Sequence, residues 1–374
     1  MKSPSYIRKS DGQILNSNNM ININDYINTY DYVNSHFEFS ENISRMIAIS
    51  IALDEDRIYD RDINYMSKFA SSLPWAEKYY TNRSDFKEFT QKKLPDWMNI
   101  KVDPRFKTIR FKICKYMPLV FHHLRIIDKI SIDKILEALD PLNNLENIVN
   151  TKISGGRSDN PIIYTWNKNF ILKTISKQEK SIFEKMVKDY QMRLRDTKTL
   201  LCRIYGLYKI KVGDQYDSFV ILMRNMCELP DESRFFTFDL KGSSVDRSSF
   251  NEVQRNFYKD GFKDEIEDNH KDLVLKDNDF EHIKLNFHLS AKDAKNLILS
   301  IDNDAQFLSN YNITDYSLLV TIHKFNKDDY IKFFNCRLMR SYDDQYLYNY
   351  SIIDFLTVII FIFYLSLRMN FNFF

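Results

Sequence analysis

The amino-acid sequence predicts a mixed α/β (α+β) protein. The 374-residue chain is 44% hydrophobic and 28% charged, a balance typical of globular rather than disordered chains. Segments with alternating apolar residues, such as 170–175, predict strands, and segments with apolar residues at helical spacing, such as 176–194, predict helices. The length allows two domains or one large elaborated domain.

The N-terminal region divides into a polar arm and a helix. Residues 1–37 are rich in Ser, Asn, Asp and Tyr without a sustained period, which predicts a mobile N-terminal arm. Residues 39–57 predict a helix that Ser40 caps and that has a broad apolar face. This face needs a partner, either the protein core or a second copy of the chain, so a homodimer through 39–57 is one expectation.

The middle of the chain alternates strand and helix patterns. Residues 105–113 predict a strand with a cationic outer face. Pro118 begins a helical segment and Ser131 caps a second, shorter helix. Residues 151–175 then predict three strands joined by turns, with Lys173 on the opposite face of its strand from its neighbours.

The C-terminal half predicts one long helix and two strands. Ser290 caps a helix whose apolar residues repeat at helical spacing as far as Leu308. Residues 314–325 and 345–356 predict strands, the first of them buried.

Charge is unevenly distributed although the net charge is only +2. Residues 168–211 carry twelve Lys or Arg against four Asp or Glu, which predicts either a cationic face or an ordinary solvated helix face. Residues 260–281 carry nine Asp or Glu against three Lys, which predicts a mobile surface loop. An anionic partner would have to meet a local basic patch, and nothing in the pattern predicts a nucleic-acid partner.

Cysteine and histidine patterns argue against a dedicated metal site. The four cysteines are scattered without metal-ligand spacing, and the seven histidines form no H-x-x-H or H-E-x-x-H pair. No secretory signal opens the chain. These features predict a reduced, cytoplasmic protein.

Several residues match the parts that phosphoryl transfer from ATP requires. Ser154, Gly155 and Gly156 lie between two predicted strands, where backbone N–H groups can approach a phosphate. Lys173 lies on the next strand, and Glu179 lies near the start of the following helix, where it can pair with that lysine. Each feature also has a simpler interpretation, as a turn or a solvated side chain.

Two aspartates and one loop complete this set. Asp315 and Asp354 lie in strongly apolar runs, where a carboxylate is costly unless it meets a cation, and together they predict a shared Mg²⁺ site. The segment FDLKGSSVDR, 238–247, places Gly242 between Lys241 and a serine in a chain with only 7 glycines. A solvated tight turn and a phosphate site both explain this glycine.

These segments together resemble the phosphatidylinositol phosphate kinase family. The resemblance extends over about residues 105–356, and its motifs occur in the family's order. The segments that carry it are FDLKGSSVDR, ITDYSLLVTIH, YSIIDF, NFILKTISKQE, TLLCRIYGLYKIKV, RFKICKYMPLVFHHLR and LVLKDNDF.

The resemblance implies a two-lobed lipid-kinase fold that is distantly similar to protein kinases, with antiparallel sheets and packed helices. After the arm, it implies an N-terminal lobe over 38–230 with dimerisation and membrane-facing elements and ATP-binding strands. An incomplete C-terminal catalytic lobe over 231–356 and an apolar tail over 357–374 follow. The implied substrate is a phosphatidylinositol monophosphate in an anionic membrane, with the 4-phosphate lipid converted to the 4,5-bisphosphate. ATP and Mg²⁺ are the implied cofactors, and the implied location is the cytoplasmic face of membranes.

The resemblance also implies residue roles. Lys173 would contact the ATP phosphates, and Asp354 would bind Mg²⁺. Asp239 and Lys241 would lie in the active-site loop, where Lys241 neutralises phosphate charge. Asp315 would be the catalytic aspartate that faces the substrate hydroxyl.

The chain departs from the family pattern at two places. Asp159 stands where the last glycine of the glycine-rich loop is expected. After IIDF the family continues with a basic, headgroup-contacting segment, whereas this chain has an apolar tail that suggests a truncation, a gene-model error, an interfacial anchor or a buried strand. The chain as written is therefore expected to have little activity. The alternative is a catalytically impaired member that acts as a phosphoinositide-binding or interaction protein.

Overall fold

The computed structural model describes most of the chain between residues 111 and 356. The described ranges are 111–139, 162–196, 198–212, 216–227, 233–262, 273–333 and 337–356, with positions 51, 143 and 229 and four short strands near the N-terminus. The predicted glycine-rich turn at 154–156 and the tail at 357–374 lie outside the described residues. Of the predicted helix 39–57, only Ile51 is described; it is helical and buried.

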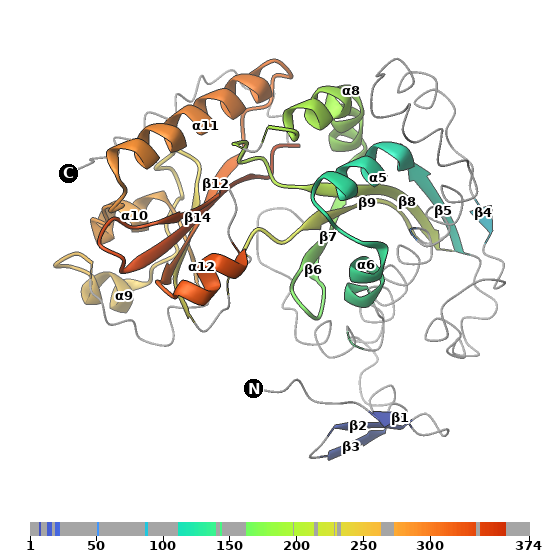
Figure 1. The fold of residues 1–374 in the computed structure, drawn as a ribbon, viewed down its shortest axis with the longest axis horizontal. Coiled ribbons are helices and arrows are strands. Elements are labelled where there is room, and N and C mark those ends of the chain that lie inside the picture. Colours follow the sequence, from blue (N-terminus) through green and yellow to red (C-terminus); the bar gives the residue numbers. More distant parts are fainter. Residues whose placement is uncertain are drawn as a thin grey trace.

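A six-stranded antiparallel sheet forms the N-terminal lobe, in the order β4-β5-β8-β9-β7-β6. Figure 1 shows it on the right, in teal to green. Its strands are β4 (Lys87–Glu88), β5 (Phe111–Tyr116), β6 (Ile162–Tyr164), β7 (Phe170–Ile175), β8 (Ile204–Val212) and β9 (Tyr216–Arg224).

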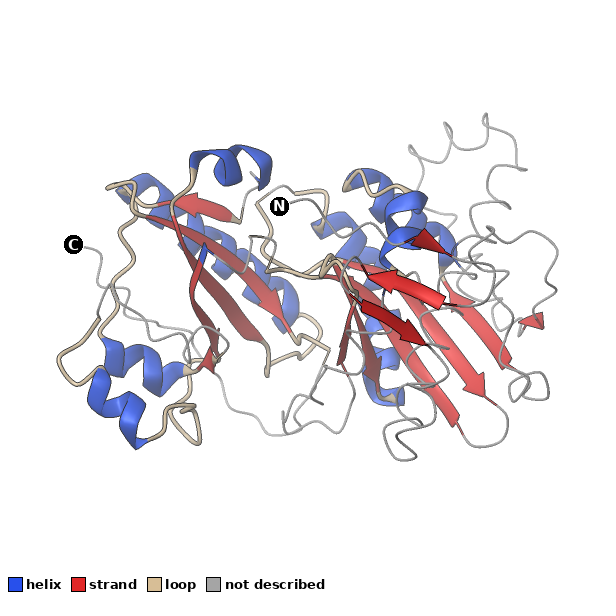
Figure 2. Ribbon diagram, turned by 90° about the horizontal axis from the view of Figure 1, so that it is seen from below, coloured by secondary structure: helices blue, strands red, loops and turns tan. Residues whose placement is uncertain are grey.

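Three helices lie against one face of this sheet (Figures 1 and 2). They are α5 (Pro118–Ile127), α6 (Ile132–Ala138) and α8 (Lys177–Arg193). Their ends follow from local chemistry: a proline opens α5, and Ser131 and Ser176 accept backbone N–H bonds at the starts of α6 and α8. Because strand side chains alternate, Leu172 is buried within β7 while Lys173 faces the opposite side.

A five-stranded sheet forms the C-terminal lobe, in the order β11-β10-β12-β14-β13. Its strands are β10 (Arg234–Leu240), β11 (Val274–Leu275), β12 (Ser317–Lys324), β13 (Leu338–Arg340) and β14 (Tyr346–Ile353). All neighbours are antiparallel except β10 and β11, which are parallel. The helices of this lobe are α9 (Glu252–Phe257), α10 (Asp277–Ile283), α11 (Ala291–Ser309) and α12 (Lys327–Phe333).

The two faces of the C-terminal sheet differ in chemistry. Register places Phe238, Val320 and Tyr350 side by side on an apolar face, where Phe238 meets Phe280 of α10 edge-on at 5.2 Å. The other face carries the polar row Thr237, Thr321 and Asn349, which are also in register. The apolar face contributes to the main core, and the polar row on the other face is also buried.

The two lobes meet through the segment that joins α8 to β8. Leu201 forms a parallel bridge with Ile352 of β14. The Ile352 N–H donates to Leu200 O at 2.7 Å, and the Cys202 N–H donates to Ile352 O at 2.9 Å. These backbone bonds fix the end of β14 against the N-terminal lobe.

The structure confirms the predicted mixed fold with antiparallel sheets and packed helices, and it confirms helices at 118–127, 132–138, 177–193 and 291–309. The prediction of a surface loop over 260–281 is wrong for its described second part, which forms β11 and most of α10. Leu275 is fully buried beside β10, so burial of this apolar side chain and the backbone pairing with β10 outweigh the acidic composition around them.

A small antiparallel sheet lies within the predicted N-terminal arm, and sequence analysis did not predict it. Its strands are β1 (Ile7–Arg8), β2 (Gln13–Asn16) and β3 (Asn19–Asn22). Among the described helices, none is both long and apolar enough to cross a membrane.

Replacing Gly206 by alanine is expected to destabilise the N-terminal sheet. Gly206 lies at a register shift in β8, and a Cβ there would overlap the ring of Tyr208, which is only 3% exposed and cannot swing away. Overpacking of this kind costs about 1–3 kcal/mol. Urea unfolding should show this loss for Gly206→Ala, whereas Ser218→Ala on neighbouring β9 should stay within about 0.5 kcal/mol of the parent. Equal midpoints for all three proteins would contradict the close packing at Gly206.

Candidate active site

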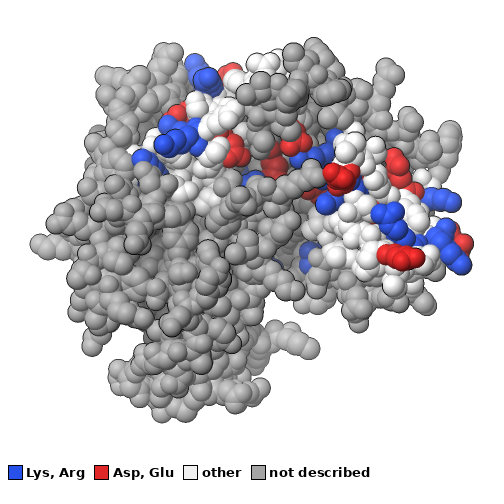
Figure 3. Space-filling view, turned by 180° about the vertical axis from the view of Figure 1, so that it is seen from behind, with Lys and Arg blue, Asp and Glu red and all other residues white. Residues whose placement is uncertain are grey.

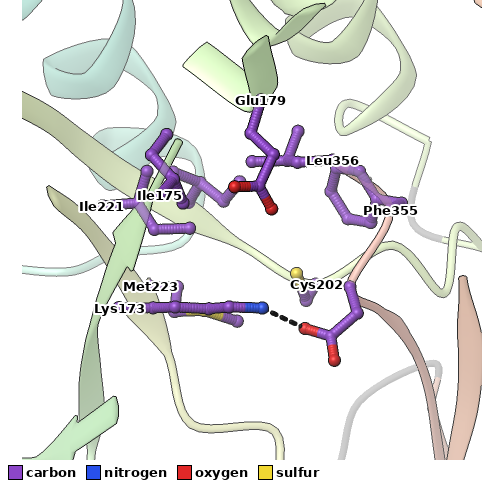
Figure 4. A pocket seen from close by; sticks show the side chains of 10 residues that line it. Lys173, Ile175, Glu179, Cys202, Ile221, Met223, Phe355 and Leu356 are labelled. Carbon is purple, nitrogen blue, oxygen red and sulfur yellow. Dashed lines mark hydrogen bonds and ion pairs between the residues drawn. The ribbon is translucent and has the colours of Figure 1, made fainter. Parts of the chain in front are cut away.

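The first candidate charge pair joins the two lobes. Lys173 projects from β7, and Asp354 follows the last residue of β14. Lys173 Nζ lies 2.6 Å from Asp354 Oδ1, and the two side chains are 14% and 40% exposed (Figure 4). The residues are 181 positions apart in sequence, so only the folded chain brings them together.

A small, partly open pocket lies beside this pair. Figure 4 shows apolar side chains around it, with the Lys173 ammonium, the Asp354 carboxylate and the Glu179 carboxylate facing the space between them. The lining residues are Lys173, Ile175, Glu179, Cys202, Ile204, Ile221, Met223, Asp354, Phe355 and Leu356. Apolar walls around a few converging charges are typical of small-molecule sites.

Local electrostatics hold Lys173 in its charged form. Burial alone would lower the pKa of Lys173, but the charge and hydrogen bond of Asp354, with a smaller effect from Glu179, raise it. Burial, with the Asp354 charge nearby, raises the pKa of Cys202 to about 12, so this thiol stays protonated at neutral pH. The pocket therefore presents a fixed cation beside a carboxylate, and no thiolate.

The backbone at Asp354 is in an uncommon conformation. Its φ of 59° lies in the left-handed region, which aspartate tolerates better than most residues. The next residue, Phe355, is 1% exposed, and its ring lies 5.9 Å from the ring of Tyr190 on α8. The packing of Phe355 holds this turn on one side, and the pairing of β14 with β12 holds it on the other. The fold therefore sets the direction of the Asp354 carboxylate.

A second charge pair lies at the edge of the C-terminal sheet. Lys241 follows β10, and Asp315 precedes β12. Because β10 and β12 are antiparallel neighbours, the end of one meets the start of the other. Lys241 Nζ lies 2.8 Å from Asp315 Oδ1, with both side chains partly exposed. A cation and a carboxylate are thus available to solvent at one place.

The loop that carries Lys241 is held by Asp277 of α10. The backbone N–H of Gly242 donates to Asp277 Oδ1 at 2.7 Å, and that of Lys241 donates to the same oxygen at 3.0 Å. Gly242 has a φ of 70°, which explains why glycine occupies this position. The glycine therefore allows the chain to bend so that one carboxylate can bind two successive N–H groups.

Arg247 links Asp277 to Asp239. Its Nε lies 2.8 Å from Asp277 Oδ2, and its Nη2 lies 3.0 Å from Asp239 Oδ1 and also contacts the Asp239 carbonyl. Burial alone would lower the pKa of Arg247, and the two carboxylates raise it. Asp239, predicted as a catalytic residue, thus has a defined partner that anchors the loop.

Asp279 supports the following segment. Its carboxylate is buried and accepts from the Ser248 hydroxyl at 2.5 Å, from the Ser249 N–H at 2.7 Å and from the Lys276 N–H at 3.0 Å. Sequence analysis did not assign Asp277 or Asp279 a role, although both lie in the LVLKDNDF segment. The sequence signal that could have identified them is the presence of two acidic residues in the first turn of a short helix, where they can accept backbone N–H groups.

Three buried side-chain oxygens of the polar row on the C-terminal sheet have no hydrogen-bond partner among the described residues. Thr237, Thr321 and Asn349 are each at least 95% buried, and within the described part of the chain Thr237 Oγ1, Thr321 Oγ1 and Asn349 Oδ1 have no hydrogen-bond partner. The Asn349 amide reaches the carbonyl of Met226, which follows β9. Buried polar atoms of this kind are normally satisfied by ordered water or a polar ligand.

The predicted residues fall into three groups. Lys173, Glu179 and Asp354 line one pocket, where Glu179 also closes the capping box of α8 with Ser176. Lys241 and Asp315 pair at the sheet edge, with Asp239 on the neighbouring strand end. Ser154, Gly155 and Gly156 lie outside the described residues.

The described acidic residues suit a metal that is bound together with a ligand. Within the described ranges, no group of three or more His, Cys, Asp or Glu could hold a metal ion by itself. Mg²⁺, however, is usually bound by one or two carboxylates together with substrate phosphates and water. The partly exposed Asp354 carboxylate fits that mode.

Comparison with known proteins connects this site to a family. The family model for phosphatidylinositol-4-phosphate 5-kinase matches residues 143–336, which is more than half of the chain.

The chain belongs to the phosphatidylinositol-4-phosphate 5-kinase family.

Lys173, Lys241 and Asp315 of this family member lie inside the matched range, and Asp354 lies beyond it.

Individual relatives are similar at modest identity. Human phosphatidylinositol 5-phosphate 4-kinase type-2 beta is 28% identical over 249 residues, which cover 64% of this chain and 52% of that protein. Phosphatidylinositol 4-phosphate 5-kinase 4 of Arabidopsis thaliana is 32% identical over 60% of this chain and 26% of its own length. Phosphatidylinositol 4-phosphate 5-kinase type-1 beta of Gallus gallus is 29% identical over 60% and 37%. The chain therefore spans about half the length of the human relative and less of the other two.

Removing the charge of Asp277 is expected to loosen the Lys241 loop. In Asp277→Asn, an amide NH₂ replaces one acceptor oxygen, so the backbone N–H groups or Arg247 lose a partner. Hydrogen exchange of the amides in 241–247 should become at least about tenfold faster. Asp246→Asn is the matched control, because Asp246 is exposed in the same loop and asparagine tolerates its φ of 55°. Parental exchange in Asp277→Asn would show that the carboxylate does not hold the loop.

Proposed function

We propose that this chain is an ATP-dependent phosphatidylinositol phosphate kinase that transfers the γ-phosphate of ATP to an inositol-ring hydroxyl of a phosphatidylinositol monophosphate. The observation that carries the proposal is the pair Lys173–Asp354 in a pocket between the lobes of a chain from this family. Phosphoryl transfer needs positioned cations and carboxylates more than covalent chemistry, and this site supplies both.

Lys173 and Asp354 have complementary partners in MgATP. The ammonium of Lys173 is a compact cation suited to phosphate oxygens, and its half-enclosed setting strengthens the interaction. The Asp354 carboxylate suits Mg²⁺, which when bound bridges phosphate oxygens and offsets the charge that develops on them. In the absence of nucleotide the two side chains neutralise each other. This pairing keeps both in place at little cost.

Asp315 and Lys241 suit the acceptor side of the reaction. A partly exposed carboxylate can accept a hydrogen bond from the attacking hydroxyl and then take its proton. Lys241, 2.8 Å away, can offset negative charge on the transferred group or on the phosphate of the substrate headgroup. Asp277 and Arg247 fix the loop that carries this lysine, so their contribution is positional.

The substrate that we propose first is the 4-phosphate lipid, converted to the 4,5-bisphosphate. The relatives named above include 4-phosphate 5-kinases at 32% and 29% identity and a 5-phosphate 4-kinase at 28% identity. Assays with the two lipids, described below, test the position of transfer.

We also propose that the protein works at the cytoplasmic face of anionic membranes. Lys168, Lys177 and Lys185 are exposed cations of the basic run, and each basic residue near such a surface contributes about 1 kcal/mol. On the face shown in Figure 3, Lys and Arg alternate with Asp and Glu, so that face offers no patch of a single sign among the described residues. A homodimer through 39–57 remains a proposal from the sequence.

MgATP binding is expected to require both members of the lobe-joining pair. Lys173→Met removes the phosphate contact and Asp354→Asn removes the metal ligand, so each should abolish the thermal shift that MgATP gives the parent. At a ligand concentration about 100 times Kd, that shift corresponds to about 2.7 kcal/mol. Lys177→Met, an exposed lysine at the start of α8, is the control and should behave like the parent. Parental nucleotide shifts in both site variants would refute the assignment of the site.

Vesicle assays separate the kinase from the alternative, a binding protein without turnover. Radiolabelled ATP with vesicles of phosphatidylinositol 4-phosphate or 5-phosphate should give a labelled bisphosphate, at the low rate expected from the sequence. Asp315→Asn should reduce that rate by about 10²-fold or more because the hydroxyl loses its base. Asp302→Asn, an exposed aspartate on α11, should not change the rate. MgATP and vesicle binding without product on either lipid would favour the non-catalytic family member.

A further inference from the structure

Asp304 is a charged side chain in an apolar stripe of α11, and it belongs to neither charge pair. It lies on α11, where the neighbouring inward positions are Leu297, Ile301 and Leu308. Its carboxylate is 0% exposed. A buried carboxylate in such a place is costly unless donors satisfy it, so its contacts need an explanation beyond helix packing.

Three donors from the N-terminal lobe converge on this carboxylate. Arg193 Nε, at the end of α8, donates to Oδ1 at 2.7 Å, and the Thr199 hydroxyl donates to the same oxygen at 2.8 Å. The Leu200 N–H donates to Oδ2 at 2.6 Å. Burial raises the pKa of Asp304, while these donors act to lower it. All three partners come from the end of α8 and the segment that follows it.

The residues that Asp304 holds are those that pair with the end of β14. The N–H of Leu200 is bound to Asp304, and its carbonyl accepts from the N–H of Ile352 at 2.7 Å. Cys202 continues the same bridge by donating to Ile352 O. Tyr190 of α8 fixes this segment further, since its hydroxyl donates to Cys202 O at 2.7 Å. Asp354 follows Ile352 by two residues.

We infer that Asp304 is a positioning residue for the site: it fixes the segment 199–202 to α11, and that segment in turn fixes the end of β14 so that Asp354 meets Lys173. The inference concerns the same site as the proposed function and rests on it only for its effect on nucleotide binding. The contacts of Asp304 in the described structure are with Arg193, Thr199 and Leu200, and none is with Lys173 or Asp354.

A second contact between α8 and α11 provides a matched control. The Tyr311 hydroxyl, just beyond α11, donates to Asp189 of α8, one turn before Arg193. This contact also joins the two helices, but neither residue bonds to 199–202 among the interactions described. A variant at Asp189 therefore shows the effect of weakening the contact between α8 and the end of α11 alone, without loss of the Asp304 contacts.

The test compares Asp304→Asn with Asp189→Asn by hydrogen exchange and nucleotide affinity in the full chain. Asp304→Asn keeps the shape but turns an NH₂ group toward one of the donors. Amides in 350–356 should exchange about tenfold faster, more than those in the remote segment 111–139, and the Kd for MgATP should rise about tenfold. Asp189→Asn should leave both quantities at parental values.

Each result decides the matter. The inference is overturned if amides 350–356 of Asp304→Asn exchange at the parental rate. It is also overturned if their exchange increases no more than that of amides 111–139. If Asp304→Asn does not fold, Thr199→Val removes one donor while retaining the Arg193 contact, and the same local increase or its absence is decisive. If the parent binds no MgATP but Asp304→Asn still shows the expected increase in exchange, the proposed function is refuted and the positioning role is supported.

Discussion

The contact between Lys173 and Asp354 is the interaction on which the rest of this site depends. It joins a strand of the N-terminal sheet to the end of a strand in the C-terminal sheet, at 2.6 Å. The pocket lies where these two elements meet, because its walls come from β7, β9, α8, the start of β8 with the residues before it, and the turn after β14. A change in the placement of either lobe would separate the charges and open the pocket together.

Local sequence signals predicted the parts that this contact uses. Alternation within β7 placed Lys173 opposite to Leu172, and the apolar run before Asp354 marked the end of a buried strand. Ser176 and Ser290 identified helix starts through their capping chemistry. These signals succeed because they depend on residues within one turn or one strand.

Long-range partners could not be predicted in the same way. Sequence analysis proposed Glu179 as the partner of Lys173, and the ion pair that the structure shows is with Asp354, which is 181 residues away. The same limit applies to Asp277, which binds a loop 35 residues before it, and to Asp304, which binds Leu200 across 104 residues. Asp304 did carry a detectable signal, since a carboxylate within an apolar helical stripe requires a buried donor.

The central claim is that the Lys173–Asp354 pair is the MgATP site, and a structure of the chain with a non-hydrolysable ATP analogue and Mg²⁺ tests it most directly. The account predicts that the ion pair separates, with Lys173 Nζ within hydrogen-bond distance of a phosphate oxygen and an Asp354 carboxylate oxygen about 2.0–2.1 Å from the metal. A nucleotide bound elsewhere, with Lys173 and Asp354 still paired, would contradict it.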